Sequence, residues 1–578
     1  MRNLLVYLKR YKKETALAPL FKMLEASFEL LIPLVMAQII DRGIAQEDRG
    51  LIFQMCLIMI SLGIIGLVCS ITAQYFAAKA AVGFSAELKH SLFDHIQSLS
   101  FSEIDTIGTS TLITRMTSDV NQVQSGVNLV LRLFLRSPFI VLGAMVMAFT
   151  IDVKAAMVFA VTIPLLCVVV FGIMLISMPL YKKVQTLLDK ILGITRENLT
   201  GARVVRAFNK EETEIERFME GNESLTKMQM FVGRISALMN PVTYIIINGA
   251  AAALIWTGAW QVENGHITQG EVVALVNYMS QILVELIKLA NLIITVTKAF
   301  ACANRIEAVF ETKPGLASAS GSMPDEKMEP EEAVSFEHVS LIYQNAGEES
   351  LTDIHFKVRK GQTVGIIGGT GSGKSSIVHL IPRFYDAAAG SVKVNGIDVK
   401  EYPLEELREK IGMVMQKAVL FQGTVRENLL WGKEDATEEE MWRALEISQA
   451  KEFVETKEGK LDARIAQGGK NLSGGQKQRL TIARALIRKP QILILDDSAS
   501  ALDFATDAKL RKALREMEKE LTVFIVSQRA SSIQYADIII VMDDGRIAGT
   551  GTHKELLENC GVYREIYDSQ FQKEGRGQ

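Results

Sequence analysis

Paired cysteines and a strong net charge are both missing from this 578-residue sequence. Its 63 Lys and Arg residues nearly balance 66 Asp and Glu residues, so the net charge is −3 and nothing indicates a nucleic-acid partner. The cysteines show no paired spacing, which argues against a disulfide framework or a zinc site. They are Cys56, Cys69, Cys167, Cys302 and Cys560.

The N-terminus lacks the short apolar core and small-residue cleavage site of a secretory signal peptide. Its first 14 residues, MRNLLVYLKRYKKE, contain five basic side chains instead. Basic segments beside membrane spans stay in the cytoplasm. We therefore expect the N-terminus to be cytoplasmic.

Charged residues are absent from residues 51–78, 155–180 and 235–262. Each run exceeds the ~20 residues that cross a bilayer as a helix. The loops at 41–50, 152–154 and 263–270 are short and have few basic residues, so we expect them to be external, whereas the long basic intervals 79–132 and 181–234 should be internal. Six spans are predicted, at 17–40, 51–78, 133–151, 155–178, 236–260 and 270–294.

The two long internal intervals have apolar residues at three- and four-residue spacings. This pattern predicts that the spans continue as helices into the cytoplasm, although two independent amphipathic linkers are an alternative. A Pro-, Gly-, Ser- and acid-rich stretch, 311–332, marks a linker. Beyond it, β-rich runs alternate with helical stretches, as in an α/β domain. We expect a membrane domain at 1–310 and a nucleotide-binding domain at 333–578.

A phosphate-binding loop follows the predicted strand TVGIIG and precedes the helical stretch SIVHLI. In this context the pattern G-x-x-x-x-G-K-[ST] is specific, because glycine-rich backbone amides surround phosphates. Lys374 would contact the β/γ-phosphate oxygens and Ser375 would bind Mg²⁺. The expected ATP-binding residues are Gly368, Gly369, Thr370, Gly371, Ser372, Gly373, Lys374, Ser375 and Ser376.

Two later motifs add to the loop. The run ILILD places Asp496 at the carboxyl end of a buried strand, where open parallel sheets bind ligands, and an acid there can hold the water shell of Mg²⁺. In NLSGGQKQRL, Ser473, Gly474 and Gly475 begin a helix whose exposed amides would face an anion.

Taken together, the chain resembles a half-transporter of the ATP-binding cassette exporter family over essentially its whole length. The motifs occur in the family's order: the phosphate loop, Gln416 in GMVMQKAVLF, LSGGQ, ILILD, and SALD ending at Asp503. The resemblance implies that Gln416 helps to hold Mg²⁺ and that Tyr343 stacks on adenine, unless Tyr343 belongs to a strand core. It also implies two ATP molecules between two such domains, each bound by one chain's phosphate loop and the other's Ser473, Gly474, Gly475 and Gln476.

Two positions depart from the family pattern. Asp497 replaces the glutamate that activates the attacking water, which retracts the carboxylate by about 1.3 Å. Gln528 replaces the histidine that contacts the γ-phosphate, and an amide cannot carry a proton or positive charge as imidazole can. Both changes predict a degenerate ATP site.

Homo-oligomers are the usual assembly, but self-pairing would give two weak sites. We therefore hypothesise a heterodimer whose partner has the Glu and the His. A homodimer with slow hydrolysis at both sites, an ATP-gated channel or regulator, and substrate import are the alternatives. The resemblance further implies that ATP-driven closure is transmitted near residues 101–109 and 201–208, the latter reaching the partner.

The resemblance favours alternating-access export of small amphipathic drugs or lipids across a bacterial inner membrane, with the ATP-binding domain in the cytoplasm. Because no extra domain precedes the spans, a peptide exporter with a fused protease is not expected. Trp256 and Trp260 fit an outer aromatic belt. Lys22, Glu25 and Glu29 lie near the cytoplasmic end of span one, and Glu285 can pair with Lys288 on its own helix. Polar residues in the spans are candidates to line a cavity: Glu29, Gln38, Asn248, Asn277, Glu285 and Asn291.

Overall fold

The computed structural model describes residues 3–316, 331–344, 346–517 and 521–571. The chain forms two compact units, one of residues 1–97 and 110–312 and the other of residues 98–109 and 313–578. Most of the predicted linker, residues 317–330, lies outside the described residues.

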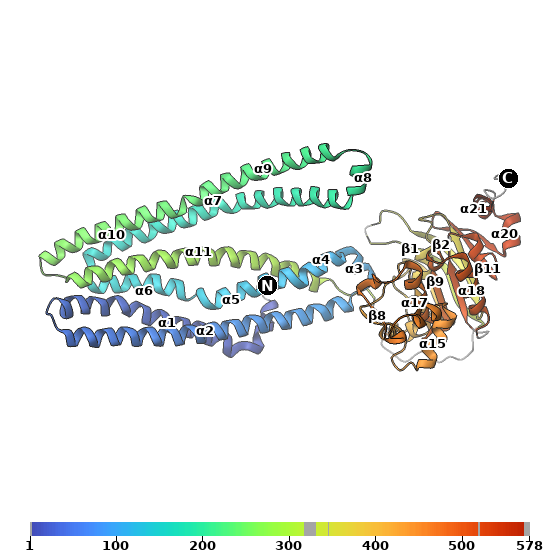
Figure 1. Cartoon of the computed structure of the whole chain (residues 1–578), viewed down its shortest axis with the longest axis horizontal. Helices are drawn as coiled ribbons and strands as arrows, with labels where there is room; N and C mark the ends of the chain where they lie inside the picture. The colour runs from blue at the N-terminus through green and yellow to red at the C-terminus, as the bar shows by residue number, and fades with distance from the viewer. Residues whose placement is uncertain (1–2, 317–330, 345, 518–520, 572–578) are drawn as a thin grey trace. The chain divides into compact units, whose positions relative to one another are not determined.

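Six helical stretches in the described part of the first unit are long and apolar enough to cross a membrane. This agrees with the predicted fold class. The stretches are Leu4–Ile44, Arg49–Ser98, Thr109–Ile151, Val153–Thr200, Glu211–Glu263 and Gln269–Glu311 (Figure 1). Their main elements are α1 (Lys12–Gln38), α2 (Arg49–Ser98), α4 (Thr109–Thr114), α5 (Val120–Leu133), α6 (Arg136–Ile151), α7 (Val153–Thr200), α9 (Glu211–Ala237), α10 (Met239–Glu263) and α11 (Gln269–Glu311).

The helices are much longer than a bilayer requires. At 1.5 Å per residue, the 50 residues of α2 and the 48 of α7 extend about 75 Å and 72 Å, against a hydrocarbon core of about 30 Å. This confirms the prediction of long helical extensions. The third stretch is interrupted at Phe134 and Leu135, between α5 and α6.

Small side chains form much of the membrane unit's core. Ala26 of α1, Ala144 of α6, Ala156 of α7 and Ala274 of α11 are completely buried in one cluster. Lipid tails are as apolar as the side chains, so helices in a membrane gain little from the hydrophobic effect and associate through close packing. Alanines at the contacts allow that close approach.

The described part of the second unit contains two main sheets and a short antiparallel pair, β7 (Gly423–Thr424) with β8 (Arg464–Ile465). In the larger, in the order β12-β11-β3-β10-β9-β6, only β12 pairs antiparallel. The smaller is antiparallel, in the order β2-β1-β4-β5. The strands are β1 (Glu332–Leu341), β2 (Leu351–Arg359), β3 (Thr363–Gly368), β4 (Ala389–Val394), β5 (Ile397–Asp398), β6 (Ile411–Val414), β9 (Ile492–Asp496), β10 (Thr522–Val526), β11 (Ile538–Asp543) and β12 (Arg546–Gly551).

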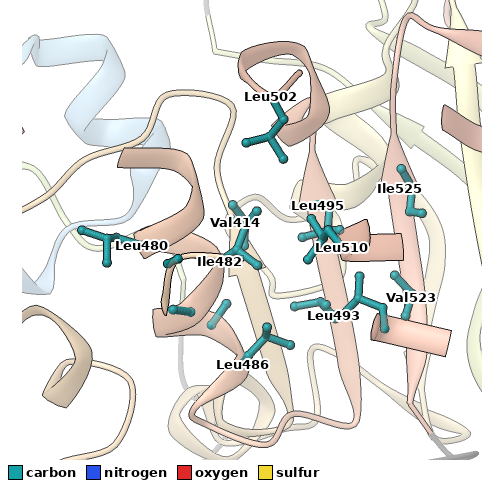
Figure 2. Close-up of a cluster of buried hydrophobic side chains, with 14 of the residues drawn as sticks. Val414, Leu480, Ile482, Leu486, Leu493, Leu495, Leu502, Leu510, Val523 and Ile525 are labelled. Atoms are coloured by element: carbon teal, nitrogen blue, oxygen red, sulfur yellow. The ribbon is translucent and has the colours of Figure 1, made fainter. Parts of the chain in front are cut away.

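Parallel strands are usually buried on both faces, which explains their nearly continuous apolar sequences. All five residues of β9 and of β10 are buried. On one face, helices α17 (Gly474–Leu486) and α18 (Phe504–Arg515) pack with the strands into an apolar core (Figure 2). Leu493 and Leu495 of β9 and Leu486 of α17 belong to this core. It fixes the strand ends that carry the site.

A short helix, α3 (Phe101–Ile107), belongs to the second unit although it lies between membrane helices in sequence. Its Phe101 ring lies 4.6 Å from that of Phe384, measured between centroids. Tyr385 Oη donates a hydrogen bond to Asp105 at 2.7 Å. The first segment predicted to transmit closure, residues 101–109, therefore contacts the α/β unit.

Candidate nucleotide-binding site

A cavity of about 790 Å³ lies at the carboxyl ends of the parallel strands. Open α/β sheets bind ligands at this edge. The cavity collects residues from several of the sequence motifs. Its lining includes Tyr343, Thr370, Gly371, Gly373, Lys374, Ser375, Ser376, Gln416, Asp497 and Gln528.

The phosphate loop connects β3 to helix α12 (Lys374–Leu380). Gly371 and Gly373 have φ of +84° and +90°, a region that residues with a Cβ rarely adopt. At Gly373 a Cβ would also lie 2.7 Å from Leu351 Cδ2. Both glycines are therefore needed for the shape of the loop.

Lys374 is buried within its own loop. Its Nζ donates to the main-chain oxygens of Gly368 at 3.0 Å and Gly369 at 2.5 Å. Burial lowers the pKa of Lys374, and the carboxylates of Asp497 and Asp496 partly oppose that shift. The side chain is thus held where phosphate oxygens would be its counter-charge.

Ser375 and Asp496 meet at the base of the loop. Ser375 Oγ donates to Asp496 Oδ1 at 2.9 Å, and Asp496 is 2% exposed at the last position of β9. With Gln416 nearby, these hard oxygen donors fit Mg²⁺, which binds through one or two protein ligands, waters and phosphates. No cluster of three or more His, Cys, Asp or Glu among the described residues could hold a metal unaided. Bound there, Mg²⁺ would neutralise phosphate charge.

Asp497 lies directly beyond β9 with φ of +45°, in the left-handed region that Asp tolerates better than most residues. Its main-chain N–H donates to Val526 O at 3.0 Å, and its Oδ2 accepts from Gln416 Nε2 at 3.3 Å. Burial, with a contribution from Asp496, raises the pKa of Asp497. The carboxylate therefore points into the cavity on a backbone fixed by the next strand.

Gln528 follows β10, two residues beyond its last residue, and lines the same cavity. Its main-chain oxygen accepts a hydrogen bond from Gln570 Nε2 at 2.8 Å. The structure thus brings both departures from the family pattern, Asp497 and Gln528, to the lining of the cavity that also contains Lys374.

Tyr343 lies just beyond β1, at the edge of the cavity. Its Oη donates to Ser376 Oγ at 2.9 Å, and its ring meets that of Tyr385 edge-on at 5.0 Å. It also packs against the core beneath the smaller sheet. Tyr343 is thus partly a core residue and partly a wall of the cavity, and stacking on adenine stays a prediction.

The signature motif does not line this cavity in the isolated chain. Ser473 precedes α17 and forms a capping box with Gln476, which places Gly474 and Gly475 in the first helical turn. Ser473 and Gly474 are exposed. Asp503 similarly caps α18 by accepting from the Thr506 amide at 2.9 Å. Ser473, Gly474 and Asp503 thus lie exposed outside this cavity, and their binding of a partner's ATP stays a prediction.

Sequence reasoning missed two features beside the cavity. His379 Nε2 lies 3.4 Å from Asp496 Oδ2. Its position four residues after Ser375 on one helix face was an available signal. Asp544 and Gly545, both with positive φ, form the turn between β11 and β12 and line the cavity. The sequence Asp-Gly predicts a tight turn, but it does not predict that the turn lies beside the cavity.

Comparison with known proteins identifies the class. Residues 15–286 match the model of the ABC transporter transmembrane region, and residues 351–500 match that of the ABC transporter family. The chain therefore belongs to the ABC transporters. It combines six apolar helices with an ATP-binding domain, which makes it an ATP-hydrolysing membrane transporter.

Particular relatives are similar over nearly the whole length. The chain is 37% identical to an uncharacterised ABC transporter ATP-binding protein of Mycobacterium tuberculosis (98% of this chain, 97% of the relative). It is 31% identical to a putative multidrug export ATP-binding/permease protein of Bacillus subtilis (99% of each). A solved structure of a bacterial Atm1-family ABC exporter with ATP bound gives a TM-score of 0.80 at 22% identity, covering 97% of this chain and 99% of that one. The fold is therefore that of an ABC exporter.

Proposed function

We propose that this chain is one subunit of a heterodimeric, ATP-driven exporter of amphipathic compounds, and that its own ATP site hydrolyses slowly. The observation that carries the proposal is that Asp497 and Gln528 line the same cavity as the phosphate loop. Two independent chemical losses at one site weaken hydrolysis more than either alone, while the loop and Asp496 still bind ATP and Mg²⁺.

Each departure removes a different contribution. The Asp497 carboxylate stops one methylene short of the position that a glutamate would reach, and a misplacement of ~1 Å can reduce a rate roughly a hundredfold. Its contact with Gln416 at 3.3 Å is a long hydrogen bond. Gln528 can donate to a phosphate oxygen but cannot supply positive charge there. The site is thus suited to holding ATP.

The signature side supports the partner's site. Ser473, Gly474, Gly475 and Gln476 form a capped helix start whose exposed amides and dipole can bind an anion from outside the chain. In the proposed heterodimer these residues and Asp503 complete the ATP site on the partner's phosphate loop. Hydrolysis occurs mainly there.

Two exposed apolar features support an exchange of contacts between subunits. Helix α8 (Ala202–Ala207) has no buried residue, and Phe208 beyond it is 72% exposed. On the α/β unit, the rings of Phe421 and Trp431 stack at 4.4 Å and remain 46% and 67% exposed. We assign α8 and Phe208 to the aromatic pair of the partner's α/β unit, while α3 contacts its own.

Relatives support the class of transported compound and the location. Besides the putative multidrug exporter, the chain is 32% identical to an ATP-dependent lipid A-core flippase of Desulfotalea psychrophila, over 84% of this chain. Drugs and lipids share an apolar body with a polar end. The bacterial origin of these relatives supports a bacterial inner membrane as the location, and the basic N-terminal segment supports a cytoplasmic N-terminus and ATP-binding unit.

The experiment compares the ATPase activity of this chain in nanodiscs, purified alone and with a second half-transporter that has Glu and His at the positions of Asp497 and Gln528. The lone chain should bind ATP but turn it over at least about tenfold more slowly than the pair. Asp497→Asn should leave the pair's rate nearly unchanged, whereas the matching Glu→Gln change in the partner should abolish it.

Brisk activity from the lone chain that Asp497→Asn abolishes would instead identify a homodimeric exporter. ATP-dependent uptake of an amphipathic dye into inverted vesicles separates pumping from gating, since only a pump accumulates the dye against a gradient. Dye movement that stops at equal concentrations would identify an ATP-gated channel.

A further inference from the structure

A chain of alternating charges connects three helices inside the membrane unit. Arg136 of α6 donates to Glu29 Oε2 of α1 at 2.7 Å and to Glu285 Oε1 of α11 at 2.6 Å. Lys288 Nζ contacts the same Glu285 oxygen at 2.7 Å, and Ser137 Oγ donates to Glu285 Oε2 at 2.8 Å. The order is Glu29, Arg136, Glu285, Lys288, and the four charges sum to zero.

The inner and outer members of this chain differ in exposure. The side chains of Arg136 and Glu285 are 8% and 3% exposed, whereas those of Glu29 and Lys288 are 36% and 40% exposed. Glu25 also lies 4.0 Å from Arg136 and pairs with the buried Lys22 at 2.6 Å, so this second branch of the network is neutral as well. One carboxylate and one ammonium, at opposite ends of a neutral network, are therefore the charged groups available to a ligand.

Both ends open on one cavity of about 440 Å³ between α1, α2 and α11. Ionisable groups inside a membrane domain face the bundle interior or an aqueous cavity rather than lipid. On α11 the cavity is lined by Asn277, Ser280, Gln281, Val284, Glu285 and Lys288. The polar members follow one helix face at three- and four-residue spacings, as expected for a pathway wall.

The Glu29 end is rich in hydrogen-bond acceptors. Pro33, four residues later in α1, has no N–H to donate to the Glu29 main-chain oxygen. Gln281, which also lines the cavity, has a buried Oε1 with no hydrogen-bond partner among the described residues. The cavity thus offers two acceptors besides the carboxylate, whereas Lys288 is a donor. Ile32, Met36 and Met59 form an apolar wall beside them.

We propose that this cavity binds the zwitterionic headgroup of an amphiphile, with the ligand's ammonium at Glu29 and Gln281 and its phosphate or carboxylate at Lys288. A ligand with one charge would leave the network unbalanced in a medium of low dielectric, and such charges are costly to bury. A zwitterion adds no net charge and bridges the two ends of the chain. The apolar wall takes the ligand's tail.

The position of the cavity along the helices suits a headgroup from the cytoplasmic leaflet. Arg136 opens α6, which ends at Ile151, and Glu285 lies within α11, which begins at Gln269. At 1.5 Å per residue both are about 22–24 Å from the outer ends of their helices, in the cytoplasmic part of a ~30 Å hydrocarbon core. This inference rests on the orientation and the amphipathic substrate of the proposed function.

The test compares four probes that carry the same fluorescent acyl chain. They are a lysophosphatidylethanolamine, a lysophosphatidylglycerol, a primary alkylamine and a neutral monoacylglycerol. Binding is measured by fluorescence titration of the full chain in nanodiscs, with the partner half-transporter where it co-purifies. We expect the zwitterionic probe to bind about tenfold tighter than the other three, since hydrogen bonds to charged groups are among the stronger polar contacts.

Single variants identify the two ends. Glu29→Gln should weaken binding of the zwitterionic probe about tenfold and shift the preference toward the anionic probe. Lys288→Gln should weaken binding of the zwitterionic probe by a similar factor and shift the preference toward the alkylamine. The double variant Glu29→Gln with Lys288→Gln keeps the charge balance of the network but removes both ends, and it should abolish the preference for the zwitterion. The matched control, Glu223→Gln with Lys227→Gln, removes an exposed ion pair of 2.7 Å on α9 and should change nothing.

Two outcomes would overturn the proposal: no preference for the zwitterionic probe, or equal losses for all four probes in both single variants. Competition by soluble glycerophosphoethanolamine separates a free zwitterion from a membrane lipid as the source, and either result supports the site. ATP-driven movement is measured separately. A preference for the zwitterionic probe without ATP-driven transport would contradict the proposed exporter function but support the binding site. Transport of amphiphiles without that preference would contradict only the binding site.

Discussion

Two surfaces of the ATP-binding unit carry the predicted nucleotide motifs, and they differ in the residues that they supply. The surface around the phosphate loop has Lys374, Ser375 and Asp496, but Asp497 and Gln528 stand where the family pattern has Glu and His. The signature surface, by contrast, has Ser473 to Gln476 on a capped helix. The first set would act on this chain's own ATP and the second on a partner's. In the proposed heterodimer, ATP binding, ATP hydrolysis and completion of the partner's site would therefore depend on different residues of one domain.

The largest effect is expected from Gly474→Asp on the signature surface. A Cβ at Gly474 meets nothing within 4 Å, so the change leaves this chain's packing intact while placing a carboxylate against the partner's triphosphate. Loss of such anion-stabilising contacts costs roughly a hundredfold or more in rate. The measurement is the ATPase rate of the purified pair.

Gly561→Asp is a matched control for that change. Gly561 is also the first residue of a helix, α21 (Gly561–Phe571), and a Cβ there also meets nothing within 4 Å. It should leave the rate unchanged. If the pair with Gly474→Asp retained more than half of its activity, this chain's signature motif would not complete the competent site.

A gain of function is expected when the phosphate-loop surface is restored. Asp497→Glu with Gln528→His supplies the missing reach and the missing imidazole, and should raise the lone chain's ATPase rate about 10- to 100-fold. Adding Lys374→Ala should abolish the gain. An unchanged rate in a variant that still binds ATP would show that the two positions do not account for slow hydrolysis.

The sequence predicts the fold because each element has a strong local signal. The run 51–78 has no charged residue on any face of a helix, so it predicts a membrane span by itself. The run ILILD is apolar on both faces of a strand until its last residue, which predicts a buried parallel strand, and β9 has a neighbouring strand on each side. The six long helices and the α/β unit with its mixed sheets are confirmed on this basis. The phosphate loop was found because its chemistry requires a fixed spacing of residues in one segment.

Features assembled from distant segments were not predictable in the same way. The Glu285–Lys288 pair follows from helical spacing and is confirmed, but Arg136 lies 149 residues from Glu285 and nothing local links them. His379 beside Asp496 and Tyr385 beside Asp105 likewise depend on how strands and helices pack. Periodicity specifies which face of an element is buried, but not which element covers it.

A smaller, few-fold effect is expected at the contact of α3 with its own α/β unit. Phe101→Ala removes the ring that packs on Phe384, and aromatic pairs contribute about 0.5–1.5 kcal/mol beyond burial. Transport per ATP hydrolysed should therefore fall several-fold, while ATP binding should not change.

Tyr385→Phe is the graded comparison, because it keeps the ring and removes only the hydrogen bond to Asp105, worth about 1 kcal/mol. Its effect should be smaller than that of Phe101→Ala. An equal fall in ATP affinity and transport would indicate a folding defect rather than lost coupling.

The smallest effect concerns stability and pH. Burial raises the pKa of Asp497 above its usual 3.8, so folding disfavours the ionised carboxylate. This destabilisation is complete above the folded-state pKa and disappears as the pH falls through that value toward 3.8. Asp497→Asn should therefore raise the Tm of the nucleotide-free chain at pH 7 by no more than a few degrees, since 1 kcal/mol corresponds to about 2–4 °C in a domain of this size.

The signature surface should show the opposite sign. Hydrogen bonds from Thr506 lower the pKa of Asp503, so this carboxylate stabilises the fold above its unfolded-state pKa, and the contribution is lost as the pH falls through the lower folded-state value. Asp503→Asn should thus lower the Tm at pH 7. The Asp497→Asn difference should vanish as the pH falls toward 3.8, whereas the Asp503→Asn difference should persist until the pH falls below 3.8. Shifts of the same sign at pH 7 would mean that Asp497 is not a buried, destabilising carboxylate. The carboxylates of the two surfaces would then not differ in the sign of their effect on stability.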